Sequence, residues 1–244
     1  MENFRPISLL NSISKVLEKS VFNQLYNYFE TNKLFFISQY GYRKMHSTET
    51  TCLELIDKIS KQLDSNQTPI CLFLDLSKAF DTLNHDILLS KLKYYGLTDA
   101  PLRWFNSYLL DRKQYVELDG KKSSVSFINT GVPQGSILGP LLFIIYINDI
   151  NSASKLLNAS LYADDTSLNT VLSAFDVDDN NLISTKINEE LALISEWLAT
   201  NKLSLNVKKT KFMLFRFAQK STQNMPKLEL RINGISIEQV KTFS

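Results

Sequence analysis

Apolar residues recur every three to four positions in several parts of the chain, a spacing typical of amphipathic helices. This pattern predicts helices over residues 13–29, 50–63, 98–110 and 183–198, and another that ends at Gly96 and is capped by Asn84 or Asp86. The apolar segment 141–150 predicts a well-buried helix, because Pro140 is tolerated near a helix start.

Other stretches have the pattern of strands. Residues 70–74 form a short apolar run that predicts a strand buried on both faces. Residues 159–168 predict two short strand-like segments on either side of a pair of acids. Residues 210–217 read as a further strand. Asp119-Gly120 and Asn233-Gly234 predict hairpins, the first between residues 115–118 and 124–129, the second within 228–237. Irregular alternation of helices and strands favours an α+β fold with a mixed sheet.

Composition excludes several classes of protein. Glycine and proline together make up 13 of 244 residues, against about 12% on average, and 44% of residues are hydrophobic, so we expect a packed core rather than a disordered chain. The longest apolar stretch, 137–147, is shorter than the ~20 residues of a membrane span, and no signal peptide is visible. We therefore expect an intracellular protein without a membrane segment. Cys52 and Cys71 lie in apolar patterns and are expected to be buried, reduced thiols.

The net charge of +2 conceals an uneven distribution. Residues 149–196 contain nine acids and two bases, and residues 201–231 contain eight bases and one acid. Two solvated faces of different charge would explain this distribution as well as a division between two functional regions would.

Three aspartates are the candidate metal-binding residues. Asp75 ends the predicted buried strand, where a carboxylate is costly unless it is paired or binds a metal, although a turn or capping aspartate is the simpler alternative. Asp164 and Asp165 are adjacent and repel each other. If the two strands are neighbours, the three carboxylates converge at one sheet edge and suit two hard cations such as Mg²⁺, held ~3.5–4 Å apart, in phosphoryl transfer.

Five sequence blocks then carry a family resemblance. They occur in this order: FRPISLL (4–10), QYGYR (39–43), FLDLSKAFD (73–81), GVPQGSILGP (131–140) and YADD (162–165). The set closely resembles the reverse transcriptase domain of non-LTR, LINE-like, jockey-type retrotransposons, and it covers nearly the whole chain.

The resemblance implies a right-hand polymerase fold with fingers and palm, and with the thumb absent or truncated. It implies fingers over 1–68, palm over 69–97, a connection over 98–130, palm with the YADD hairpin over 131–227 and a truncated hairpin similar to the primer grip over 228–244, all within one domain.

Site residues follow from the same resemblance. Asp75 and Asp164 would bind two Mg²⁺ ions, with Mn²⁺ as a possible substitute, Asp165 would complete the cluster, and Leu76 would contribute its backbone carbonyl. Phe80 would exclude the 2′-hydroxyl of a ribonucleotide; ordinary core packing is its alternative role.

Two further motifs are implied to contact nucleotide or template. Gln134 and Gly135 would support the template base and the incoming nucleotide, unless they only form a helix-entry turn. Lys209 would protonate the departing pyrophosphate, with Lys208 and Lys211 as rival candidates and a solvated basic face as the alternative. Additional candidates for triphosphate or template contacts are Arg5, Lys15, Arg43 and Lys44, and for base stacking Tyr40 and Tyr42.

The resemblance implies an RNA-directed DNA polymerase that adds deoxynucleotides to a primer 3′-hydroxyl during retrotransposition. Its partners would be an RNA template, a DNA primer or nicked target DNA, and deoxynucleoside triphosphates; the oligomeric state is not predicted. One alternative is an inactive, truncated remnant that at most binds nucleic acid. Another is a different palm-type two-metal enzyme such as a nucleotide cyclase, against which the block at 133–135 argues.

Overall fold

The computed structural model describes residues 7–175, 179–217 and 227–241 and confirms a mixed helix and strand fold. Two compact units are present, each assembled from separate stretches of chain: residues 1–35 with 78–147, and residues 36–77 with 148–244. The division into fingers and palm segments stays a prediction.

The first unit is mainly helical. Its helices are α1 (Ser12–Thr31), α3 (Ala79–Thr82), α4 (His85–Tyr94), α5 (Asp99–Leu109) and α6 (Leu138–Tyr146). Helix α6 is the centre of this unit: apart from Pro140 its residues are buried, and both α1 and α4 contact it. Of the two residues proposed to cap α4, Asn84 is the cap, because its side chain accepts a hydrogen bond from the Ile87 backbone N–H.

Helix α1 buries a different face from the one that its apolar spacing predicts. Leu25 and Phe29 are buried as expected, whereas Val16 is 71% exposed and Leu17 is also exposed. In the same half of the helix the charged residue Glu18 is only 1% exposed. The prediction of one apolar stripe was therefore wrong for the first half of α1, where a polar contact made by Glu18 sets the orientation.

Two other predictions in this unit need correction. Helix α6 begins about one turn earlier than expected and ends before Ile147, with Pro140 in its first turn, where its missing N–H costs no helical hydrogen bond. The turn at Asp119-Gly120 is confirmed, but its strands are β4 (Glu117–Leu118) and β5 (Lys121–Lys122). The outer pair is β3 (Lys113–Gln114) with β6 (Ser126–Phe127).

The second unit is built on a five-stranded sheet in the order β13-β10-β1-β8-β7. These strands are β1 (Pro69–Leu74), β7 (Asn158–Tyr162), β8 (Asp165–Val171), β10 (Lys211–Leu214) and β13 (Glu238–Gln239). The central strand β1 pairs antiparallel with both β8 and β10. Smaller pairs are β2 (Leu76–Ser77) with β9 (Ser204–Leu205), and β11 (Arg231–Ile232) with β12 (Ile235–Ser236), which is the hairpin predicted around Asn233-Gly234.

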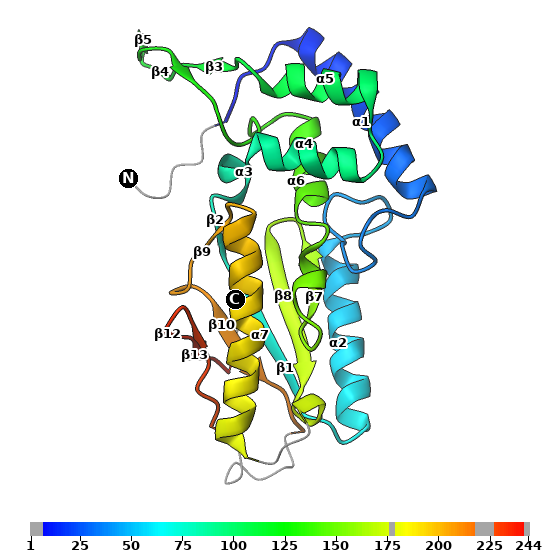
Figure 1. Ribbon diagram of the computed structural model, residues 1–244, viewed down its shortest axis with the longest axis vertical. Helices are drawn as coiled ribbons and strands as arrows, with labels where there is room; N and C mark the ends of the chain where they lie inside the picture. The colour runs from blue at the N-terminus through cyan, green and yellow to red at the C-terminus, as the bar shows by residue number, and fades with distance from the viewer. Residues whose placement is uncertain (1–6, 176–178, 218–226, 242–244) are drawn as a thin grey trace. The chain divides into compact units, whose positions relative to one another are not determined.

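Helix α7 (Asn180–Thr200) covers one face of this sheet (Figure 1). Its predicted stripe, which includes Ile187 and Leu191, is buried, as are Ile70 and Leu72 of β1, so apolar burial holds helix and sheet together. Two 3-10 turns, η1 (Ile150–Ala153) and η2 (Leu172–Phe175), flank the hairpin strands.

Helix α2 (Thr48–Asp64) begins at a capping box formed by Ser47 and Thr50. Its packing is looser than predicted, because Ile59 is the one fully buried residue of this helix, all of which is described. Cys52 consequently lies exposed, which contradicts the expectation of a buried thiol, whereas Cys71 in β1 is buried as expected. Within the residues that the structure describes, no helix is long and apolar enough to cross a membrane.

We expect iodoacetamide to alkylate Cys52 and to spare Cys71 in the folded chain at about pH 8, because the thiolate is the reactive form. Burial raises the pKa of the Cys71 thiol to about 12, so this group stays protonated. Peptide mass mapping should find one labelled cysteine in the native protein and two in urea. Equal labelling of both residues in the native protein would contradict the buried position of Cys71.

Candidate active site

Two of the candidate aspartates lie at the ends of neighbouring strands. Leu74 of β1 is paired with Thr166 of β8, so Asp75 directly follows β1 where Asp165 begins β8. This confirms the expected adjacency of segments that are 89 residues apart in sequence. The antiparallel register brings both carboxylates to the same sheet edge.

Asp164 lies in the tight turn that joins β7 to β8. Tyr162 pairs with Asp165, which leaves Ala163 and Asp164 as the two turn residues. Ala163 adopts a φ of 58°, in the left-handed region that such two-residue hairpins require. Asp164 and Asp75 are half-buried, and Asp165 is exposed.

The QYGYR block contacts this turn and the strand that leads into it. Gln39 forms an isolated parallel bridge with Leu161, and Tyr40 donates its backbone N–H to the Leu161 carbonyl at 2.8 Å. Gly41 lies so close to the turn that a Cβ there would be 2.1 Å from the backbone nitrogen of Ala163. Only glycine allows this approach, a role that the sequence analysis did not recognise.

Arg43, a candidate triphosphate contact, is engaged within the same loop. Its Nη1 donates to the carbonyls of Phe36 and Gln39, at 3.4 and 3.2 Å. The buried Gln39 side chain accepts from the Gly41 N–H at 3.0 Å, and its Nε2 has no hydrogen-bond partner among the described residues. Arg43 therefore stabilises the loop that supports the YADD turn, and its proposed contact with triphosphate stays a prediction.

A backbone contact links the lysine segment to Asp75. Asn206 donates its N–H to the Asp75 carbonyl at 2.8 Å, directly after the pairing of β2 with β9. The N–H of Lys209 then bonds the Asn206 carbonyl at 3.1 Å and closes a turn that contains Lys208 and Lys209. The segment that carries the lysines is thus anchored next to the aspartate, a contact that sequence spacing alone could not reveal.

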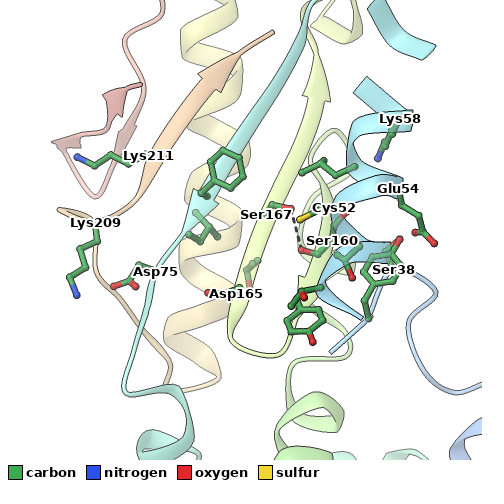
Figure 2. A pocket seen from close by; sticks show the side chains of 18 of the residues that line it. Ser38, Cys52, Glu54, Lys58, Asp75, Ser160, Asp165, Ser167, Lys209 and Lys211 are labelled. Atoms are coloured by element: carbon green, nitrogen blue, oxygen red, sulfur yellow. Dashed lines mark hydrogen bonds between the residues drawn. The ribbon is translucent and has the colours of Figure 1, made fainter. Parts of the chain in front are cut away.

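These elements surround a pocket of about 1180 Å³ on the face of the sheet opposite α7 (Figure 2). Asp75 and Asp165 line it at the strand ends, whereas Asp164 is not among its lining residues. On the wall formed by the lysine turn and β10, the basic residues are Lys208, Lys209 and Lys211. Helix α2 contributes further lining residues, among them Cys52, Glu54 and Lys58. Lys211 forms an ion pair with Glu238.

A polar network crosses the strands on this face. The Cys71 thiol donates to the Asn169 carboxamide oxygen at 2.8 Å, and Asn169 in turn donates to the Ser160 hydroxyl at 3.2 Å. On the α2 side, burial and then a hydrogen bond with Glu54 raise the pKa of Tyr40 above its usual value. Tyr40 thus stays a neutral pocket-lining phenol at physiological pH.

The oxygen-rich acidic edge fits a hard cation better than zinc, which prefers nitrogen and sulfur ligands. Asp75 and Asp165 share the pocket, and Asp164 lies beside Asp165 in the turn. In the described part of the chain, no three histidine, cysteine, aspartate or glutamate side chains are already gathered as a metal-binding group. The donor chemistry fits Mg²⁺, while the three carboxylates are not closed around one point.

In the first unit, hydrogen bonds and packing restrain Phe80 and Gln134. The Gln134 carboxamide nitrogen donates to Asp81 Oδ1 at 2.8 Å, and the Phe80 carbonyl accepts from the Val132 N–H at 2.9 Å. Gly131, with a φ of 80°, is packed against the Asp81 backbone where a Cβ would overlap it. The half-buried Phe80 ring lies 4.7 Å from the Phe143 ring, centroid to centroid.

The remaining candidates for nucleotide or template contacts differ in their exposure and backbone contacts. Gly135 follows Gln134 with a φ of 99°, and the Gln134 carbonyl accepts from the Ser8 N–H at 2.8 Å. Lys15 is exposed on α1 and Lys44 is exposed after the QYGYR block. Arg5 lies outside the described residues. Roles for these residues stay predictions.

The second unit combines a five-stranded sheet, an acid-tipped hairpin and an aspartate-ended strand, and solved structures share the fold of the chain. A telomerase of Candida tropicalis in complex with the TWJ fragment of telomeric RNA superposes with a TM-score of 0.60 at 13% identity, over 92% of this chain and 36% of that one. The apo enzyme of the same organism, truncated from its C-terminal domain, gives a TM-score of 0.55 at 13% identity, over 84% of this chain and 41% of that one. The chain has the right-hand polymerase fold.

The family follows from the sequence comparisons. Residues 1–239 match the family described as "Reverse transcriptase (RNA-dependent DNA polymerase)", and the chain belongs to this family. It is 30% identical over 98% of its length to the probable RNA-directed DNA polymerase from transposon BS of Drosophila melanogaster, and 31% identical over 86% of its length to that from mobile element jockey of Drosophila funebris. The chain covers 26% and 23% of those two relatives, or about a quarter of their length. The expected relationship to non-LTR retrotransposons is confirmed.

Replacing Gly41 with alanine should lower the free energy of unfolding by about 2–3 kcal/mol, because the new methyl group overlaps the backbone of the YADD turn. Urea denaturation measures this loss. Gly120→Ala is the control, since a Cβ at that exposed turn meets no atom within 4 Å and costs only the backbone strain of a positive φ, about 1 kcal/mol. Equal losses for the two variants would show that Gly41 is not in close contact with the turn.

Proposed function

We propose that this chain is the part of an RNA-directed DNA polymerase that adds deoxynucleotides to a primer 3′-hydroxyl by two-metal phosphoryl transfer, in retrotransposition. The observation that carries the proposal is the register of β1 with β8. This register places Asp75 and Asp165 together at a pocket that is also lined by Lys208 and Lys209. An acidic edge next to basic side chains suits a reaction in which cations and phosphate oxygens meet.

Asp75, Asp164 and Asp165 would hold two Mg²⁺ ions, with the Leu76 backbone carbonyl as a further oxygen ligand. When bound, such ions lower the barrier to attack on the α-phosphate and stabilise charge on the leaving oxygen. The pairing of β1 with β8 and the two-residue turn orient the carboxylates, and the Asn206 contact with the Asp75 carbonyl fixes the backbone just before Leu76.

Lys209 would give a proton from its Nζ to the pyrophosphate oxygen as that oxygen leaves the α-phosphate. It is favoured over Lys211 because Lys211 is paired with Glu238. Lys208 lies in the same turn and lines the same pocket, so it remains the rival candidate.

Phe80 and Gln134 would select and support the nucleotide. Packing against Phe143 limits movement of the Phe80 ring, which is what a steric barrier to a 2′-hydroxyl needs. The Asp81 carboxylate orients the Gln134 carboxamide, and a fixed amide can distinguish hydrogen-bond donors from acceptors.

Nucleic acid is the proposed partner class: an RNA template and a DNA primer or nicked target, together with deoxynucleoside triphosphates. Membership of the reverse transcriptase family and the fold shared with a telomerase in complex with telomeric RNA support an RNA template.

Asp164→Asn should reduce primer extension on poly(rA) with Mg²⁺ by about 10²–10³-fold, because a neutral amide is a poor ligand for a hard cation. Incorporation of labelled dTTP measures the loss. Asp119→Asn, at an exposed turn of the other unit, is the matched control and should keep full activity. Undiminished extension by Asp164→Asn would refute the metal assignment, and salt-dependent RNA binding by a wild-type chain that does not extend primers would favour a nucleic-acid-binding module.

Lys209→Gln should lower the maximal rate of extension by about 10²-fold, since a general acid is lost. Single-turnover rates provide the measurement. Lys211→Gln is the control, because it removes a lysine of the same pocket that is already paired with Glu238. A greater rate loss in Lys208→Gln than in Lys209→Gln would transfer the role to Lys208.

A further inference from the structure

A carboxylate is buried in the first unit, far in sequence from the acidic edge. Glu18 of α1 is 1% exposed, and a buried charge is strongly unfavourable unless hydrogen bonds compensate it. It is also the residue that interrupts the apolar pattern of α1. Its contacts must therefore account for its position.

Glu18 caps helix α6 from outside. Its Oε2 accepts hydrogen bonds from the backbone N–H groups of Ile137, at 2.7 Å, and Leu138, at 3.3 Å. Ile137 is the N-cap of α6 and has no side chain able to cap it. A helix start has unpaired N–H donors and a partial positive charge, so a carboxylate is the group best suited to it.

The second oxygen of the carboxylate is bound as well. Glu18 Oε1 accepts a hydrogen bond from the Tyr108 hydroxyl of α5 at 3.2 Å. Burial, and then the negative charge of Glu18, raise the pKa of Tyr108 to about 12, so the phenol remains a donor at any physiological pH. One side chain of α1 thus joins α5 and the start of α6.

The capped helix start immediately follows the loop that contains Gln134. Within this loop the Ser136 N–H bonds the Pro133 carbonyl at 3.0 Å, and the Ser136 hydroxyl accepts from the Gly139 N–H at 2.9 Å. At its other side, Gln134 is tied to Asp81. Residues 133–137 therefore form a short turn whose end is fixed by Glu18, so a shift of the α6 start would displace Gln134.

We propose that Glu18 is a positioning residue for nucleotide binding: by capping α6 it fixes the loop that presents Gln134 to the incoming deoxynucleoside triphosphate. This inference rests on the polymerase function proposed above. Glu18 acts through the loop and does not touch the nucleotide. Its loss should therefore raise the KM for the nucleotide more than it lowers kcat.

Glu18→Gln tests the proposal with two measurements on the same chain. Hydrogen exchange, read on peptides that cover residues 131–139, should become faster, because a neutral amide binds the helix start less strongly than a carboxylate. The KM for dTTP on poly(rA) should rise about five-fold, as expected for the loss of roughly 1 kcal/mol of hydrogen bonding. Glu189→Gln, at an exposed glutamate of α7, should change neither value.

Tyr108→Phe distinguishes the contact made by Glu18 Oε1 from the contacts made by Oε2. It removes the hydrogen bonds of the phenol with Glu18 and with Ser136 and leaves both backbone N–H contacts of Oε2, so exchange in 131–139 should rise less than in Glu18→Gln. If Glu18→Gln does not fold, Glu18→Asp, which keeps the charge on a shorter side chain, must show the faster exchange and the higher KM.

Three results would overturn the proposal: unchanged exchange in the glutamine variant, faster exchange with an unchanged KM, or a fall in kcat and thermal stability without a change in KM. Absence of primer extension by the wild-type chain would refute the polymerase function instead. Hydrogen exchange would then still decide whether Glu18 holds the loop.

Discussion

The antiparallel pairing of β1 with β8 is the constraint on which the candidate site depends. Since the strand register sets which residues face each other, the pair of Leu74 with Thr166 determines that Asp75 and Asp165 lie at one edge. A slip of one residue would send alternate side chains to the opposite face of the sheet. The apolar residues of β1 oppose such a slip, because Ile70 and Leu72 would then leave the core beneath α7.

Several backbone contacts hold the site in addition to this register. Gly41 lies against the YADD turn, and Asn206 bonds the Asp75 carbonyl. Backbone atoms make these contacts. Members of both charged stretches meet in the fold: Asp165, from the acidic stretch, and Lys208 and Lys209, from the basic stretch, line a single pocket. The pocket thus brings together one acid of the acidic stretch and basic residues of the other stretch.

Carboxylates perform a different task in the first unit. Glu18 and Asp81 each accept hydrogen bonds from the segment around Gln134, one at the backbone of the helix start and one at the carboxamide. The carboxylates at the acidic edge of the sheet are proposed to hold cations, whereas the buried carboxylate of Glu18 accepts hydrogen bonds from within the first unit. Burial and the available donors, rather than residue type, decide between the two roles.

The sequence by itself determined the helices with long apolar periods, the central strand, the hairpins at Asn233-Gly234 and YADD, and the family, because these features depend on local spacing and on motifs read in order. It could not determine the inward face of α1, the exposure of Cys52 or the start of α6. Each of these depends on contacts with distant segments, which compete with local periodicity. Tertiary structure alone decided that Gly41 supports the acidic turn, that Lys211 is paired with Glu238 and that Glu18 caps α6. The physical reason is common to all three: a close backbone approach, an ion pair or a cap needs two groups that only the folded chain brings within reach of each other.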